Sequence, residues 1–219
     1  MAVIYDTTLV PSKLELLAAW LPSQPWYRGG SAPKLSRAGG FRLDDPSGEV
    51  GIELMVINDA SSADPTSYFT PLTYRGAPLS DAEDHLIGTT EHGVLGRRWV
   101  YDGAHDPVFV RQVLALLRGD VEAQAQNESN MIDSTVFREL SVVGELVPSV
   151  AMRIESGPAS TDVQGLTLSS RTVELRVVRA LRAADDEPYA KGSVGEIVAN
   201  WTPVDGPVCR GALAFVAEA

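Results

Sequence analysis

The chain has 219 residues, of which 44% are hydrophobic, so it can bury a sizeable core in one large domain or two small ones. The 18 Lys and Arg residues stand against 29 Asp and Glu residues, and the formal charge of −11 makes nucleic acid and anionic membrane surfaces poor partners. A single cysteine excludes an internal disulfide, and the lack of a signal-like start or a membrane-length apolar run predicts a cytoplasmic protein.

The first thirty residues predict a strand, a helix and a loop. Residues 2–5 are apolar and strand-like. Ser12 and Glu15 have the spacing of a capping box, in which each side chain accepts a hydrogen bond from a backbone amide of the other residue, so a helix should begin there. Leucine and alanine then recur at helical spacing until Pro22, which cannot continue the helix. We expect a loop at residues 25–30, which is rich in proline and glycine.

The following eighty residues predict a small sheet and a second helix. Hydrophobic residues alternate within residues 40–74, which indicates two or three antiparallel strands. Residues 79–102 lack a clear period and predict a long structured loop with a short strand at 98–101. Asp106 followed by proline is a typical helix start, and the apolar face continues to Gly119.

A polar stretch separates two halves of the sequence. Residues 119–130 contain no aromatic side chain, which is typical of a linker, so we predict domains at 1–120 and 134–219. The second half is strand-like at 136–143, 150–155, 172–181, 194–201 and 208–217. The predicted fold class is therefore α+β, with an antiparallel sheet and two main helices followed by a β-rich half.

Three histidines fall in one glycine-containing stretch beside acidic residues. They are His85, His92 and His105, and their spacing matches no standard zinc pattern. An enzyme could use His92 or His105 with Glu91 or Asp106 as an acid–base pair near neutral pH. That hypothesis requires these side chains to converge in one pocket, and the alternative is that they have structural or surface roles.

Aromatic and charged residues gather in two segments, a composition typical of surfaces that bind sugars or proteins. The candidate binding residues are Trp26, Tyr27, Arg28, Glu91, His92, Arg98, Trp99, Asp102 and His105. The alternative is that the aromatic rings fill the core while the arginines pair with nearby acids.

Common catalytic motifs are missing from the sequence. It contains no serine nucleophile elbow, no P-loop and no dinucleotide fingerprint, so we predict no catalytic residue, no metal and no cofactor. A further alternative is a self-associating scaffold, such as a homodimer, because an edge strand at 208–217 would need to be paired or protected.

Several motifs together resemble a known family. The segment Trp20-Leu21-Pro22-Ser23-Gln24-Pro25-Trp26-Tyr27-Arg28-Gly29-Gly30 resembles the signature near the start of bacterial maltokinases, although Pro25, Tyr27 and Gly30 depart from it. Other parts of the family's N-terminal cap domain occur in the same order at 71–76, 86–92, 96–102 and 106–107. The likeness covers about residues 1–120.

The resemblance implies a functional context. Residues 173–181 are similar to an N-lobe strand of aminoglycoside-phosphotransferase-like kinases, whose ATP-phosphate lysine would fall at Arg176. The sequence has neither the catalytic loop nor the metal-binding Asp motif of those kinases. We therefore expect a non-catalytic protein of maltose, trehalose and α-glucan metabolism that binds a protein partner or an oligosaccharide.

Overall fold

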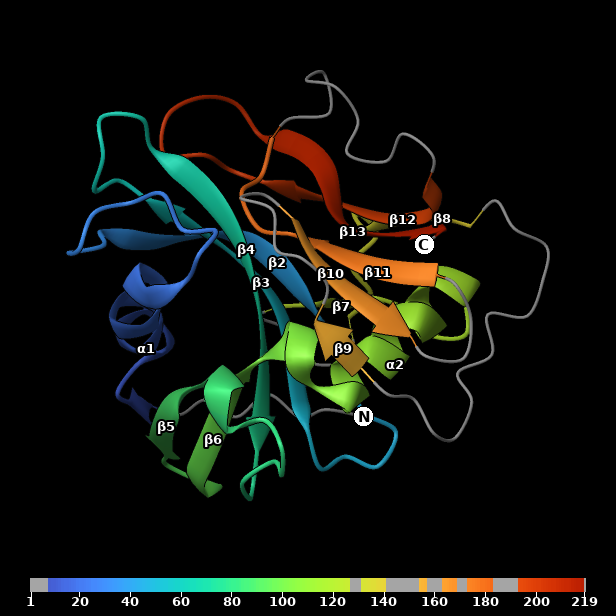
Figure 1. Cartoon of the computed structure of the whole chain (residues 1–219), viewed down its shortest axis with the longest axis horizontal. Coiled ribbons are helices and arrows are strands. Elements are labelled where there is room, and N and C mark those ends of the chain that lie inside the picture. Colours follow the sequence, from blue (N-terminus) through green and yellow to red (C-terminus); the bar gives the residue numbers. More distant parts are fainter. Residues whose placement is uncertain are drawn as a thin grey trace.

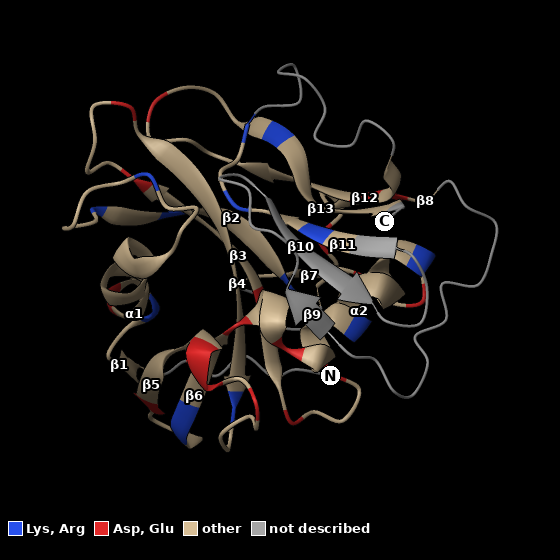
Figure 2. Ribbon diagram, in the orientation of Figure 1, with Lys and Arg blue, Asp and Glu red and all other residues tan. Residues whose placement is uncertain are grey.

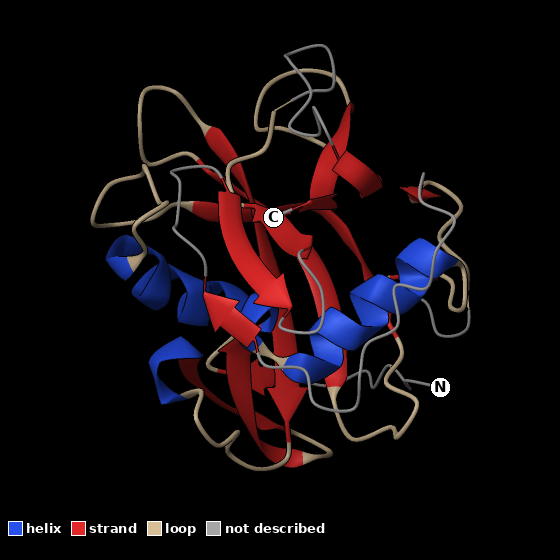
Figure 3. Cartoon of the chain, turned by 45° about the vertical axis from the view of Figure 1, so that its right-hand side comes forward, coloured by secondary structure: helices blue, strands red, loops and turns tan. Residues whose placement is uncertain are grey.

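The computed structural model describes residues 8–126, 131–140, 154–156, 163–168, 173–182 and 193–218, and these form mainly an antiparallel sheet with two α-helices (Figures 1 and 3). The first half contains β1 (Leu9–Val10), α1 (Lys13–Trp20), β2 (Leu35–Leu43), β3 (Gly51–Asp59), β4 (Thr66–Arg75), β5 (Leu86–His92), β6 (Gly96–Asp102) and α2 (Pro107–Arg118). The second contains β7 (Gln124–Ala125), β8 (Phe137–Leu140), β9 (Ile154–Ser156), β10 (Val163–Leu168), β11 (Val173–Val178), β12 (Ser193–Trp201) and β13 (Cys209–Glu218). The short 3₁₀ turns are η1 (Leu21–Ser23), η2 (Glu83–His85) and η3 (Gly103–His105). The strand predicted at residues 2–5 lies outside the described residues.

Both predicted helices are confirmed, because their terminal signals are used as the sequence indicates. The Ser12 amide donates to the Glu15 carboxylate at 2.7 Å, and the Glu15 amide donates to Ser12 Oγ at 3.3 Å. Asp106 accepts a hydrogen bond from the Val108 amide at the start of α2, and Gly119 ends that helix with a left-handed φ of 85°. Within the described residues, neither helix is long and apolar enough to cross a membrane.

The predicted strands in residues 40–74 are also confirmed, as the meander β2–β3–β4. The short strand predicted at 98–101 is confirmed as part of β6, but the long loop predicted for the rest of 79–102 was wrong, because most of this segment is the hairpin β5–β6. Gly96 has a φ of 68° at the turn, and β6 pairs with β4 from Leu72 opposite Asp102 to Arg75 opposite Trp99. The partner strand therefore stabilises a segment whose own sequence has no clear period.

The strands close into a ring that includes both halves of the chain. From β4 the order runs through β3, β2, β12 and β13 to β11, and Ala180 after β11 then bridges back to Tyr68 in β4. The Phe69 amide donates to the Arg179 carbonyl at 2.9 Å, and the Leu181 amide donates to the Ser67 carbonyl at 2.8 Å. This closure brings Arg179 against the first half of the chain.

The ring buries two apolar clusters on opposite faces of β3. Ile52, Leu54 and Val56 belong to a core shared with α2 and with β11, β12 and β13, while Met55 and Ile57 pack with residues of α1. The segments predicted as separate domains therefore share one core and one sheet (Figure 1). The division into domains at 1–120 and 134–219 stays a prediction.

Two details of the β-rich half differ from expectation. The segment at 208–217 forms β13 as predicted, but it lies between β12 and β11. The idea that it is an exposed edge was wrong, because both of its sides are paired. Strand β10 at Val163–Leu168 was not anticipated from the sequence.

Candidate functional site

The candidate site is built around Arg179, which follows β11 and is fully buried. Its Nη2 donates to Asp102 Oδ2 at 2.7 Å, and its guanidinium carbon lies 4.9 Å from the centre of the Trp26 ring. Asp102 ends β6, whereas Trp26 lies in the loop after α1. The Arg179 guanidinium thus contacts two of the predicted binding residues, Asp102 and Trp26, which come from different segments.

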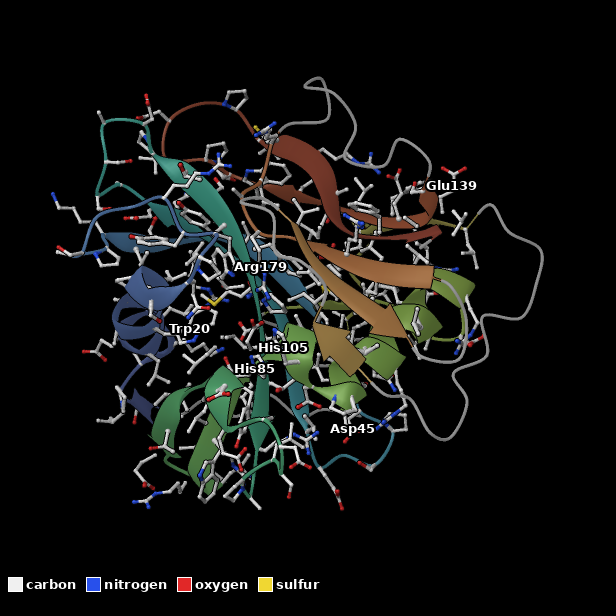
Figure 4. The ribbon with its side chains drawn as sticks, viewed as in Figure 1. Trp20, Asp45, His85, His105, Glu139 and Arg179 are labelled. Carbon is white, nitrogen blue, oxygen red and sulfur yellow. The ribbon has the colours of Figure 1, made fainter. Side chains whose placement is uncertain are left out.

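The Asp102 end of the site contains two histidines. Asp102 Oδ1 accepts a hydrogen bond from the Ala104 amide, which starts the turn η3, and this turn places His105 Nε2 at 3.9 Å from Asp102 Oδ2. The His85 ring stacks on the His105 ring with a centroid separation of 3.4 Å and an interplanar angle of 4°. Figure 4 shows the two rings together near the middle of the molecule, with Arg179 close by. We call Trp26, Arg179, Asp102, His105 and His85 the buried arginine cluster.

The Trp26 end of the site is an aromatic group whose two central rings, Trp26 and Tyr68, are buried. The Trp26 ring contacts Trp20 at 5.7 Å and Tyr68 at 5.9 Å between centroids. Trp26 and Tyr68 are buried, so neither ring offers a free face on which a sugar could stack. Tyr27 packs against Tyr68, and the Arg28 amide donates to the Tyr68 hydroxyl at 3.0 Å.

Tyr27 and Asp59 tie this loop to the end of β3. The Tyr27 hydroxyl donates to Asp59 Oδ2 at 2.5 Å, and the amides of Lys34 and Ser61 donate to Asp59 Oδ1. Burial, together with the hydrogen bond to Asp59, raises the pKa of Tyr27 above its usual range. Burial raises the pKa of Asp59, but these hydrogen bonds outweigh it and the net pKa is lowered. The Tyr27 hydroxyl therefore stays protonated, and its hydrogen bond to Asp59 holds the loop against the end of β3.

Asp106 does not pair with a histidine. Arg75 donates to both of its carboxylate oxygens, from Nε at 2.7 Å and from Nη2 at 2.6 Å, while the Val108 amide donates to Oδ1. The hydrogen bond with Asp106 raises the pKa of Arg75. Asp106 is thus committed to a buried ion pair and a helix cap, whereas Asp102 Oδ2 lies 3.9 Å from His105 Nε2.

The remaining predicted residues lie along the β5–β6 hairpin, several of them at its tip. Glu91 pairs with Arg97 in an exposed contact, and His92 Nδ1 accepts hydrogen bonds from the amides of Val94 and Leu95. Arg98 Nη2 donates to the Leu95 carbonyl. Burial and the nearby Arg98 guanidinium lower the pKa of His92.

The hairpin keeps His92 away from the other histidines. Gly96 pairs with His92 at the tip, whereas Leu86, next to His85, pairs with Tyr101 at the other end. A strand rises ~3.3 Å per residue, so His92 and His85 are about 20 Å apart. The structure does not gather the three histidines in one place. Trp99 is half-buried on β6, opposite Arg75 of β4.

A second buried polar group was not foreseen. Glu53 on β3 is almost fully enclosed and accepts hydrogen bonds from Lys13 Nζ at 2.6 Å, Tyr74 Oη at 2.8 Å and Gln126 Nε2 at 2.7 Å. Burial raises the pKa of Glu53, but the Lys13 ion pair and the hydrogen bonds from Tyr74 and Gln126 outweigh it, so the net pKa is lowered. A glutamate inside the apolar run of β3 was the available signal.

Sequence reasoning found three members of the buried arginine cluster as binding candidates, namely Trp26, Asp102 and His105. It named His85 as one of three clustered histidines but not as a binding candidate, and it did not single out Arg179. Within the part of the chain that the structure describes, no group of three or more His, Cys, Asp or Glu side chains could hold a metal ion.

The part of the chain that carries most of this cluster is also the part that matches a known family. Residues 20–106 match the maltokinase N-terminal cap domain. This cap segment contains Trp26, His85, Asp102 and His105, whereas Arg179 lies beyond it. A search of curated proteins found no match. The buried arginine cluster therefore joins the cap segment to the rest of the chain.

Proposed function

We propose that this chain is a non-catalytic accessory protein of maltose, trehalose and α-glucan metabolism, located in the cytoplasm, that acts by binding a protein partner. The family match of residues 20–106 supports the metabolic context. The observation that carries the binding role is a set of exposed aliphatic side chains in the β5–β6 turn and in the neighbouring strand β1. We call Val10, Val94 and Leu95 the tip patch, and their exposed fractions are 66%, 59% and 42%.

The tip patch favours a protein partner over an oligosaccharide. Sugar sites generally present aromatic faces beside hydrogen-bonding groups, but Trp26 and Tyr68 are enclosed in the molecule. The tip patch instead combines aliphatic side chains with the exposed pair Glu91 and Arg97. Figure 2 shows basic residues on β6 and acidic residues on the neighbouring turns, a mixture that suits the polar rim of a protein interface.

The non-catalytic part of the proposal is supported by the state of the acidic side chains near the histidines. Asp102 binds Arg179, Asp106 binds Arg75 and caps α2, and Glu91 pairs with Arg97. Each of these three carboxylates thus already has a structural contact. Such contacts oppose the free movement of a proton acceptor towards a substrate.

We further propose that the second half is related to the N-lobe sheet of aminoglycoside-phosphotransferase-like kinases. Supporting this, β10, β11, β13, β12 and β8 form consecutive antiparallel neighbours. Arg176 of β11 stands where the resemblance would put the ATP-phosphate lysine, and its planar fork differs from a compact ammonium group. We expect no thermal stabilisation by ATP with magnesium, and a clear rise in melting temperature would contradict the loss of nucleotide binding.

The binding role can be tested with purified enzymes that make or use maltose 1-phosphate. We expect the chain to bind one of them in biolayer interferometry and expect Leu95→Asp or Val94→Asp to weaken binding at least tenfold. Val208→Asp is the matched control, because Val208 is 62% exposed but lies beside β13 in another hairpin. Equal effects of all three substitutions on binding would show that the tip patch is not part of the interface.

Three parallel measurements distinguish the alternatives. Calorimetry with maltose, maltooligosaccharides, trehalose and maltose 1-phosphate would detect a sugar ligand instead of a protein partner. Light scattering would detect a homodimer. Turnover of ATP that is lost on changing one acidic side chain would contradict the non-catalytic role.

A further inference from the structure

We infer that Asp205 and Gly206, in the turn between β12 and β13, form a site of spontaneous isomerisation. The peptide link after Asp205 changes into an isoaspartyl link, in which the main chain runs through the side-chain carbon Cγ. Repair methyltransferases recognise this type of link, so the altered turn is a substrate for an enzyme of that class. This modification does not depend on the proposed binding role.

The reaction needs only the aspartyl side chain, the next backbone amide and water. The Gly206 nitrogen attacks Asp205 Cγ, and the amide proton leaves with the hydroxyl of the protonated carboxyl group as water, which gives a cyclic succinimide. Water then opens the ring. Opening at the main-chain carbonyl leaves the Gly206 nitrogen bonded to Cγ, whereas opening at Cγ restores aspartate. One water is released and one is consumed, so the mass of the chain does not change.

The turn leaves both reacting groups accessible. Asp205 and Gly206 are exposed, and a Cβ added to Gly206 would meet no atom within 4 Å. Gly206 has a φ of 121°, a conformation that favours glycine, and its lack of a side chain leaves its nitrogen open to the carboxyl group. Within the described residues, neither the Asp205 carboxylate nor the Gly206 amide is held by a hydrogen bond. The side chain is therefore free to rotate onto the amide.

The sequence contains one other Asp-Gly pair, Asp102 and Gly103, and the fold protects it. The Asp102 carboxylate accepts hydrogen bonds from Arg179 Nη2 and from the Ala104 amide. Gly103 is buried, and a Cβ added there would lie 3.2 Å from the Phe109 ring. The Asp102 side chain therefore cannot reach the Gly103 nitrogen without breaking a buried ion pair. The same dipeptide thus occurs in a reactive and in a protected place.

The base of the turn is fixed, which confines the modification to its outer part. Trp201 pairs with Cys209, the Thr202 amide donates to the Ala38 carbonyl at 2.9 Å, and the Thr202 carbonyl accepts from Asn58 Nδ2 at 2.9 Å. An isoaspartyl link lengthens the main chain by one carbon and frees the α-carboxylate, so the formal charge is kept. The exposed part of the turn accommodates the added length, and the modified chain keeps its fold.

Incubation of the full chain for several weeks at neutral pH, followed by peptide mapping, tests the site. Endoproteinase Asp-N cleaves before aspartate but not before isoaspartate, and chromatography separates the two peptides of equal mass. An exposed turn opens at a much lower free-energy cost than a buried segment, so we expect at least about tenfold more isoaspartate at Asp205 than at Asp102. Asp205→Glu should abolish the modification, because glutamate forms its larger cyclic imide far more slowly. Similar amounts at the two positions, or none at Asp205, would overturn the inference.

The same incubation in guanidinium chloride separates the effect of the fold from that of the local sequence. In the unfolded chain both Asp-Gly pairs are flexible, so the difference between Asp205 and Asp102 should fall to less than about threefold. A difference that persists in the unfolded chain would contradict protection by the fold, because it would arise from the neighbouring residues.

An isoaspartyl methyltransferase provides a second measurement on the folded protein. This enzyme transfers the methyl group of S-adenosylmethionine to the freed α-carboxylate and releases S-adenosylhomocysteine. The incubated natural chain should accept labelled methyl groups, and most of this labelling should be lost in the fresh chain and in the incubated Asp205→Glu variant. Equal labelling of the incubated chain and the incubated variant would contradict a site at Asp205.

Discussion

Arg179 Nη2 donates to Asp102 Oδ2 at 2.7 Å although the two residues are 77 positions apart in the chain. Asp102 ends the last strand of the family-matched segment, and Arg179 follows a strand beyond it. Burying an ion pair costs free energy, because both charges lose their water. The pair therefore contributes to the relative placement of two segments as much as to stability. This pair fixes how the two halves of the chain meet.

The first prediction concerns this ion pair. Asp102→Asn should lower the free energy of unfolding by about 3–5 kcal/mol, because it leaves the Arg179 charge buried without its counter-charge. Urea denaturation at pH 7.5 measures the change. Asp102→Leu combined with Arg179→Met should be less destabilising than Asp102→Asn alone, since it removes both charges together. A loss of less than 1 kcal/mol for the single variant would show that Arg179 is solvated.

The second prediction concerns the junction between β2 and β12. These strands meet where Gly39 pairs with Trp201, and a Cβ on Gly39 would lie 2.9 Å from the Asn200 carbonyl oxygen. Gly39→Ala should therefore cost roughly 1–3 kcal/mol by pushing the strands apart. Gly30→Ala is the matched control, because its nearest neighbour is Ser61 Oγ at 3.8 Å. Similar thermal unfolding of the two variants would contradict the close approach.

The third prediction concerns Glu53 and acid. Its pKa is lowered from 4.5 in the folded protein, so the stabilisation from its charge is present above about that pH and is lost as the pH falls further. Glu53→Gln should be less stable at pH 7 but should lose about 1–2 kcal/mol less between pH 5 and pH 3. Glu139→Gln, on the exposed face of β8, is the control and should follow the natural chain (Figure 4). An unchanged acid profile for Glu53→Gln would show that this carboxylate is not stabilised by folding.

The fourth prediction concerns the Tyr27 hydroxyl. Tyr27→Phe removes the hydrogen bond to Asp59 and should cost roughly 1–2 kcal/mol, because a hydrogen bond to a charged group is lost from a loop that it fastens. Limited proteolysis of residues 24–34 should also become faster. Ser23→Ala serves as a comparison, because the Ser23 hydroxyl makes its hydrogen bond to the Trp20 carbonyl outside this network. Equal rates of proteolysis for the two variants would show that the Tyr27 hydroxyl does not hold this loop in place.

Local signals explain which parts of the fold could be predicted. The Ser12–Glu15 capping box and the Asp106 cap act within a few residues, so the sequence contains all their partners. The β5–β6 hairpin was missed because its stability comes from pairing with β4. The closure of the ring through Ala180 likewise depends on a residue more than a hundred positions from its partner, Tyr68. No local pattern could have indicated that pairing.

The candidate site also combines features that the local sequence indicates with features that depend on the assembled fold. Aromatic and charged composition drew attention to Trp26, Asp102 and His105, but it could not indicate that they lie in one cluster. Trp26 and Asp102 both contact Arg179, and His105 lies beside Asp102. Arg179 itself is an arginine in an apolar strand-like run without any distinguishing spacing. Burial of a guanidinium is a property of the assembled fold, and only the structure reveals it.

The helix that follows the cap segment limits how that segment can be grafted. α2 begins directly after residue 106, where the family match ends, and its Val110, Val113, Leu114 and Leu117 fill the core between β3 and the second half. A chimera that transplants residues 20–106 alone would expose the apolar inner face of β3 to water. A stable chimera must therefore include α2, or the recipient protein must supply apolar side chains that cover the same surface.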